Sequence, residues 1–196
     1  MFHCFRRFLL SLLLVAAFAM PLAAQQAGGE DVVQLPLADD AAGARSGVAD
    51  YELQTLKGQT LRLSSLRGRV VLLDFFLAAC PHCREHAPFI ADLSKRHRDR
   101  GLTVIALCTN NPFTERELVE RYVKDSNLET EVAFVSLEVM MSFIKQRPNG
   151  SYGVPEAVLF GSDGRLAARF TAWEAVDKPA IERAIETELN KKNPGR

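Results

Sequence analysis

Cys80 and Cys83 directly follow a nearly continuous apolar run, residues 70–77. Such a run fits a strand that is buried on both faces of a parallel or mixed sheet. From residue 81 to residue 100 the apolar residues follow helical spacing, and Pro81 suits the first helical position, where a missing N–H costs nothing. The pattern predicts a strand-to-helix junction at Cys80 and an α/β fold with this strand at its centre.

The junction gives the two thiols different chemistry. A helix N-terminus offers free N–H groups and the positive end of the helix dipole, and both stabilise a thiolate at Cys80. Only the thiolate attacks a disulfide or binds a metal. Because Cys83 lies one turn further into the helix, we expect it to be more buried. We therefore predict that Cys80 is the attacking nucleophile and Cys83 the resolving thiol.

Three histidines follow or separate these cysteines. A protonated imidazole at His82 adds positive charge beside Cys80 and favours the thiolate; the alternative is a solvent-facing residue without a role. His86 and His97 are expected to be ordinary helix-surface residues and are assigned no role. Cys108 ends another apolar strand, so it is expected to be a buried small hydrophobic residue rather than a third redox thiol.

Two blocks of the sequence resemble a known family. The first is DFFLAACPHCREHAP, residues 74–88, and the second is GVPEAVLF, residues 153–160. With residues 56–58 and 63–68 they resemble the thioredoxin superfamily, in its exported TlpA/ResA/CcmG-like branch, over roughly residues 51–191. The resemblance implies a thioredoxin fold of class α/β. Its mixed central sheet is flanked by helices and carries an N-terminal β-hairpin and a central insertion.

The resemblance also implies a role for Asp74, which stands where thioredoxins place a buried acid. Because an unpaired buried carboxylate is costly, its pKa is expected to be raised. Such a group suits a proton acceptor for Cys83, acting through a water. The alternative is a structural carboxyl that is satisfied by neighbouring backbone or by a lysine.

The second block implies a substrate-binding loop. Pro155 resembles the family's cis-proline facing the dithiol, with the Val154 backbone presented to an extended substrate, strand against strand. Glu156 resembles the glutamate of a Pro-Glu pair in cytochrome c maturation members, and its alternative is a surface charge at a loop edge. Pro81 is expected to contact substrate from the dithiol side.

These features predict a thiol–disulfide oxidoreductase that exchanges disulfides with exported proteins and requires no organic cofactor or metal. The direction of electron flow is left open. The Pro-His dipeptide between the cysteines resembles the oxidising DsbA active site, whereas the rest of the chain resembles reductants such as ResA and CcmG. Ala79 and Phe76 replace aromatic residues common in the family, so substrate preference is open too.

Two other functions compete with this prediction. A copper or haem-pathway metallochaperone would use Cys80, Cys83 and His82 as ligands, but copper-delivering relatives separate their cysteines by three residues and add a distant histidine. A thiol peroxidase would share the fold, but Leu77 stands where the threonine of peroxiredoxins is expected. A zinc site would need a second pair of ligands.

The first residues predict export. Arg6 and Arg7 precede an apolar stretch, and small residues follow up to Ala24. This pattern is typical of a signal peptide, residues 1–24, while an uncleaved anchor is the alternative. Residues 25–50 read as a flexible spacer and residues 51–192 as the thioredoxin-like domain.

The expected partners follow from this compartment. They are protein thiols or disulfides and a membrane redox recycling partner, with membrane contact only if the N-terminal segment stays uncleaved. A formal net charge of +0 gives no reason to expect nucleic acid.

Periodicity predicts the remaining elements. A hairpin is expected at 51–56 and 60–63, strands at 102–107 and 132–135, a helix at 139–146, and a hairpin at 158–160 and 166–171. A capping box at Thr114–Glu117 is expected to open a helix that runs to about residue 126. Asp177 is expected to open a final helix with Ile181, Ile185 and Leu189 facing inward.

Overall fold

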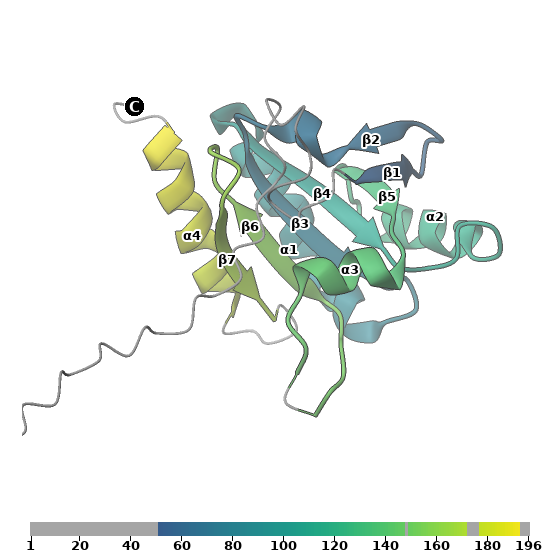
Figure 1. Ribbon diagram of the computed structural model, residues 1–196. Helices are drawn as coiled ribbons and strands as arrows, with labels where there is room; N and C mark the ends of the chain where they lie inside the picture. Colours follow the sequence, from purple (N-terminus) through teal and green to yellow (C-terminus); the bar gives the residue numbers. More distant parts are fainter. Residues whose placement is uncertain (1–50, 148, 172–176, 193–196) are drawn as a thin grey trace, which may run out of the picture. The chain divides into compact units, whose positions relative to one another are not determined.

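The computed structural model describes residues 51–147, 149–171 and 177–192, which form a seven-stranded mixed sheet with helices on both faces (Figure 1). The strands are β1 (Glu52–Thr55), β2 (Thr60–Arg62), β3 (Val70–Phe76), β4 (Leu102–Cys108), β5 (Glu131–Phe134), β6 (Glu156–Phe160) and β7 (Leu166–Phe170). Their order is β2-β1-β5-β4-β3-β6-β7. Only the β3–β4 and β4–β5 pairs are parallel, so the carboxyl ends of these three strands share one edge.

The central strand β3 lies between β4 and β6, and all its residues are buried. Asp74 is paired with Ala106 of β4 and Ala157 of β6. Because side chains alternate between the faces of a strand, Leu72, Asp74 and Phe76 share one face. Leu73 points to the other face. Burial on both faces explains why the run is apolar throughout, with Asp74 as its exception.

Helices α1 (Pro81–His97), α2 (Arg116–Asp125) and α4 (Asp177–Lys192) cover the face of Leu72 and Phe76. The opposite face is covered by α3 (Leu137–Phe143) and by the 3-10 turn η1 (Leu63–Leu66). A second 3-10 turn, η2 (Arg98–Arg100), continues α1. Figure 1 shows α3 in front of the sheet and α1 behind it. Ile181, Ile185 and Leu189 of α4 face inward as predicted.

Helix α2 begins later than the sequence pattern indicates. It starts at Arg116, and no side chain of the expected Thr114–Glu117 box caps it. Instead, Asn111 Oδ1 accepts the Thr114 N–H at 3.3 Å, while Glu115 Oε2 accepts the Asn111 N–H at 2.8 Å. An asparagine side chain readily accepts from backbone N–H groups shortly after it, and this turn takes precedence over the capping box.

Helix α3 begins earlier than expected, at Leu137. The hydroxyl of Ser136 accepts the Val139 N–H at 3.2 Å and caps the helix. A serine cap is strong enough to start the helix two residues before the apolar spacing does.

The predicted signal peptide and spacer, residues 1–24 and 25–50, lie outside the described residues and stay predictions, as does the 51–192 boundary. In the part of the chain that the structure describes, no helix is long and apolar enough to cross a membrane.

Candidate functional site

The dithiol lies where β3 ends and α1 begins. Cys80 is the N-cap residue of α1, and its Sγ accepts the Cys83 backbone N–H at 3.4 Å. Pro81 occupies the first turn of the helix. Both cysteines are free thiols, with Cys80 partly exposed and Cys83 buried. The helix therefore presents one sulfur to solvent at its N-terminus, where the Cys83 N–H points at it, and keeps the other sulfur buried one turn further in.

The loop before β6 faces the exposed thiol. The Val154–Pro155 peptide bond is cis, and the Cys80 S–H donates to the Val154 carbonyl oxygen at 3.8 Å. Pro155 is buried and Val154 half-buried. A backbone strand beside a nucleophilic sulfur is the arrangement expected for binding an extended peptide.

The two sulfurs differ in burial, and therefore in how readily they lose a proton. Burial raises the pKa of the Cys83 thiol well above its ordinary range, and the neighbouring Cys80 and Asp74 add to the effect. The Tyr122 hydroxyl of α2 donates to the Cys83 carbonyl at 2.9 Å, and its ring stacks on Phe76. Cys83 is thus held rigidly and needs help to lose its proton.

Asp74 lies beneath the dithiol with a histidine as its neighbour. Its Oδ1 lies 3.6 Å from Nε2 of His86, and both side chains are at most 4% exposed. Burial raises the pKa of Asp74 to about 8. Burial, together with the positive charge of Lys178, lowers the pKa of His86 to about 4. Although the spacing admits an ion pair, burial favours two neutral groups at pH 7.

His86 corrects the expectation drawn from the sequence. It is 2% exposed rather than a surface residue, and it packs against Phe89 with ring centroids 5.5 Å apart. His97 is buried as well, at 4% exposed, at the other end of α1. The spacing of the apolar residues Cys83, Ile90 and Leu93 could have shown that both histidines lie on the buried face of α1, because residues three and four apart share a helix face.

The backbone before the dithiol is tied to β4 by an asparagine that the sequence did not single out. Asn110 Oδ1 accepts the Ala78 N–H at 2.9 Å and the Cys108 S–H at 3.0 Å. Cys108 is fully buried, and burial raises its pKa to about 12. It therefore packs as a small hydrophobic residue and supports Asn110.

His82 lies on the solvent side of the dithiol. Its side chain is 59% exposed, and Nδ1 lies 3.8 Å from Glu85 Oε2. Pro81 is exposed beside it. The two residues thus form the rim around Cys80, where they can meet a substrate.

Glu156 lies on a different face from Asp74. Its Cα partner in the sheet is Phe75, so its side chain points to the face covered by α3. It is buried, and Oε1 lies 3.9 Å from the Arg147 guanidinium. Glu156 therefore lies directly after the cis-proline, on the sheet face opposite to that of Asp74.

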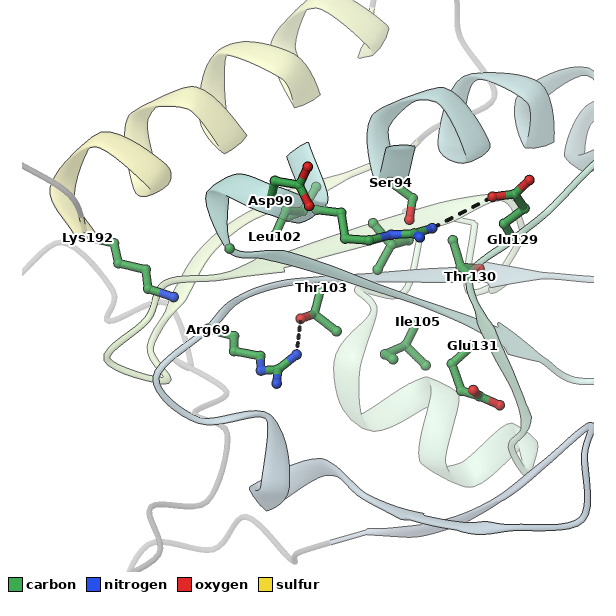
Figure 2. Close-up of a pocket in the computed structure, with 13 residues that line it drawn as sticks. Arg69, Ser94, Asp99, Leu102, Thr103, Ile105, Glu129, Thr130, Glu131 and Lys192 are labelled. Atoms are coloured by element: carbon green, nitrogen blue, oxygen red, sulfur yellow. Dashed lines mark hydrogen bonds and ion pairs between the residues drawn. The ribbon is translucent and has the colours of Figure 1, made fainter. Parts of the chain in front are cut away.

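No metal site accompanies the dithiol within the described ranges, where no three His, Cys, Asp or Glu side chains converge. A groove of about 530 Å³ lies around Leu102, at the opposite end of β4 from Cys108. Six residue steps along a strand place this groove roughly 20 Å from the dithiol edge. Figure 2 shows charged side chains along its walls, where Arg69 bonds to Thr103. Glu129 forms an ion pair with Arg98 at 3.9 Å. Its chemistry is separate from that of the thiols.

A thiol pair at a helix N-terminus, facing a cis-proline loop, can be compared with known proteins. Residues 45–184 match the AhpC/TSA family. The chain belongs to this family. Among curated relatives, the thiol-disulfide oxidoreductase ResA of Halalkalibacterium halodurans is 32% identical over 82 residues. That alignment covers 40% of this chain and 47% of ResA, so the chain spans about half the length of this relative.

Two solved structures of low sequence identity share the fold of this chain. A putative thiol:disulfide interchange protein DsbE from Chlorobium tepidum superposes with a TM-score of 0.61 at 22% identity, over 82% of this chain and 98% of that one. A secreted Mycobacterium tuberculosis disulfide oxidoreductase superposes with a TM-score of 0.57 at 19% identity, over 70% of this chain and 96% of that one. The predicted thioredoxin fold is confirmed, and with it the predicted α/β class.

Proposed function

We propose that this protein is a thiol–disulfide oxidoreductase that exchanges disulfides with protein substrates through Cys80 and Cys83. The observation that carries the proposal is the asymmetry of the dithiol: Cys80 is partly exposed at the N-cap of α1, and Cys83 is buried one turn inside. An accessible sulfur can form the mixed disulfide, and a protected one can resolve it.

The reaction balances within the dithiol. The Cys80 thiolate attacks a substrate disulfide, an S–S bond forms between Cys80 and the substrate, and the first substrate thiolate leaves. Cys83 then loses its proton and attacks Cys80, so that the Cys80–Cys83 bond forms and the second substrate thiolate leaves. Two electrons pass from the dithiol to the substrate, and the reverse sequence oxidises a substrate dithiol. Neither direction uses an organic cofactor or a metal.

Exposed apolar side chains support the inference that the substrates are proteins. Among the described residues the large exposed hydrophobic side chains are Leu77, Phe113 and Leu137. They follow the carboxyl ends of β3, β4 and β5, the edge at which the dithiol lies. Exposed apolar side chains that follow these strand ends favour the binding of a protein partner over that of a small polar molecule.

We place the activity in an exported compartment. Support comes from the basic and apolar pattern of residues 1–24 and from a structural relative described as secreted. An oxidising compartment supplies substrates and requires a membrane partner that resets the dithiol. Because Pro155-Glu156 resembles the pair in cytochrome c maturation members, apocytochrome c thiols are the first substrates to seek.

Trapping tests the proposal directly. Cys83→Ala in the full-length protein is expected to accumulate mixed disulfides through Cys80, because the second attack is removed. Cys80→Ser should abolish both trapping and exchange. The matched control is Cys108→Ala, which removes a buried thiol outside the dithiol and should leave exchange intact. If Cys83→Ala traps no protein in the exported compartment, the proposal is wrong. Peroxide turnover, or copper binding that requires both cysteines, would replace it.

A further inference from the structure

The mechanism above assigns no task to the buried His86. His86 and Asp74 face each other from α1 and β3, with Nε2 and Oδ1 3.6 Å apart. Among the described residues, neither Asp74 Oδ1 nor either ring nitrogen of His86 has a hydrogen-bond partner. Leaving three polar atoms unpaired in a core is costly, so their juxtaposition calls for a functional explanation.

The pair lies next to the thiol that must lose a proton. His86 is three residues after Cys83, so the two share a helix face. Asp74 is close enough to act on the Cys83 thiol electrostatically. The buried layer beneath the dithiol thus contains an acid, a base and the resolving thiol.

Asp74 alone is a poor base at neutral pH. Its raised pKa of about 8 keeps most of the carboxyl protonated, and a protonated carboxyl cannot accept a proton from Cys83. A neutral imidazole beside it can take that proton. The resulting carboxylate and imidazolium neutralise each other, which costs far less than an isolated buried carboxylate.

We infer that His86 and Asp74 form a proton relay for Cys83, in which His86 Nε2 takes the carboxyl proton so that Asp74 can accept the thiol proton. His86 acts through Asp74 and is therefore a positioning residue for the dithiol exchange proposed above, on which this role depends. The gap of 3.6 Å is compatible with the role, because catalytic hydrogen bonds are often long before substrate binds.

The step balances in protons and electrons. The Cys83 S–H bond breaks, its proton passes to the Asp74 carboxylate, and the carboxyl's former proton resides on His86. The Cys83 thiolate then forms the S–S bond to Cys80 while the bond from Cys80 to the substrate breaks. The departing substrate thiolate takes up one proton, and the relay returns to two neutral groups.

Charges from each neighbouring element act on the relay. The charge of Asp74 acts on the Cys83 thiol of α1 and on the Tyr122 hydroxyl of α2. Lys178 of α4 faces His86 across Phe89, with Nζ 5.6 Å from that ring centroid. Because a lysine cation disfavours the imidazolium, it helps His86 release the proton after each turnover.

Single-turnover kinetics test the relay. Reduced full-length protein mixed with bis-thionitrobenzoate disulfide releases one coloured thiol when Cys80 attacks and a second when Cys83 resolves. In wild type the second phase should be nearly independent of pH between about 5 and 8, because moving a proton inside the pair does not change its protonation. In His86→Gln the rate constant of the second phase should rise about tenfold per pH unit up to pH 8, in proportion to the fraction of Asp74 that is ionised.

At pH 6.5 the second phase of His86→Gln is expected to be about 10²-fold slower than wild type, while the first phase is unchanged. His97→Gln is the matched control, since it removes another buried histidine of α1 and should leave both phases unchanged. The double variant Asp74→Asn/His86→Gln should be no slower than Asp74→Asn alone.

Two outcomes overturn the relay. One is a second phase of His86→Gln that equals wild type across the pH range, which would leave Asp74 working alone. The other is an equal slowing of both phases at all pH values, which indicates structural damage. If the wild type releases no second coloured thiol, or releases it equally well without Cys83, the proposed function itself is refuted.

Discussion

At the scale of single residues, the environment of Asp74 decides its chemistry. The carboxyl lies in the middle of the sheet face that α1 covers, and burial raises its pKa from 3.8 to about 8. Folding therefore retains a proton that the unfolded chain releases. By linkage, a group that binds a proton more tightly in the folded state makes the protein less stable as the pH rises between its two pKa values.

This linkage predicts a stability change that can be measured. Between pH 4 and 6.5 the depressed pKa of His86 opposes the effect of Asp74, because the unfolded histidine binds a proton that the folded one lacks. From pH 6.5 to 8 Asp74 acts alone, and the free energy of unfolding should fall by about 1.4 kcal/mol per pH unit.

Asp74→Asn removes this titration. Urea unfolding across the pH series should show the free energy of unfolding of the wild type falling progressively below that of the variant as the pH rises from about 4 to 8, because His86 is present in both proteins and cancels in the comparison. A constant difference between the two proteins at all pH values would mean that the Asp74 pKa is unshifted.

At the scale of elements, the cis-proline loop depends on a close contact across a short segment. The Arg147 guanidinium lies against Gly153, where an added Cβ would overlap it, and it also approaches Glu156 at 3.9 Å. Only a glycine allows the arginine to lie there. The arginine thus links the loop that carries Val154 to the first residue of β6.

Gly153→Ala is expected to displace the Arg147 guanidinium and to remove its approach to Glu156 at the base of the loop, whose Val154 carbonyl lies 3.8 Å from Cys80 Sγ. Exchange with protein disulfides should slow by about tenfold, since small misplacements at a reacting centre are costly. Steady-state exchange with a protein disulfide measures the effect.

Removing the arginine provides the control for this change. In an Arg147→Ala background, Gly153→Ala should cost little further activity because the overlap is gone. An equal loss in both backgrounds would show that the glycine acts through backbone freedom instead.

At the scale of the whole molecule, the parallel strands bring separate loops to one edge. Leu77, Phe113 and Leu137 are distant in the chain and follow β3, β4 and β5. Phe113 is 92% exposed, so it contributes little to the core. Phe113 lines a cleft of about 440 Å³ with Thr55 and Phe134, where its exposed ring is available to a protein partner.

Phe113→Ser should therefore separate binding from chemistry. We expect kcat/KM for a protein disulfide to fall by about tenfold, from the loss of an apolar side chain at the interface. The rate with a small aromatic disulfide should be unchanged, and the free energy of unfolding in urea should change by less than about 0.5 kcal/mol. Equal losses with both substrates would remove Phe113 from substrate binding.

Local sequence determined the framework of this protein. A nearly continuous apolar run of this length favours a strand buried on both faces, and a proline directly after Cys80 suits the first position of a helix. Both conclusions depend on neighbours within a few residues, so the strand, the helix and the position of the dithiol could be predicted. The motif blocks added the fold class and the cis-proline loop.

Tertiary structure decided how the site works. Asp74 and His86, Ala78 and Asn110, and Arg147 and Glu156 are brought together from different elements or from the two sides of a loop. The same imidazole is exposed and readily protonated at one helical angle and buried and neutral at another, because desolvation and its charged neighbours set its pKa. Periodicity could show that His86 shares a face with Cys83. Only the packing of α1 on β3 could show that this face meets Asp74.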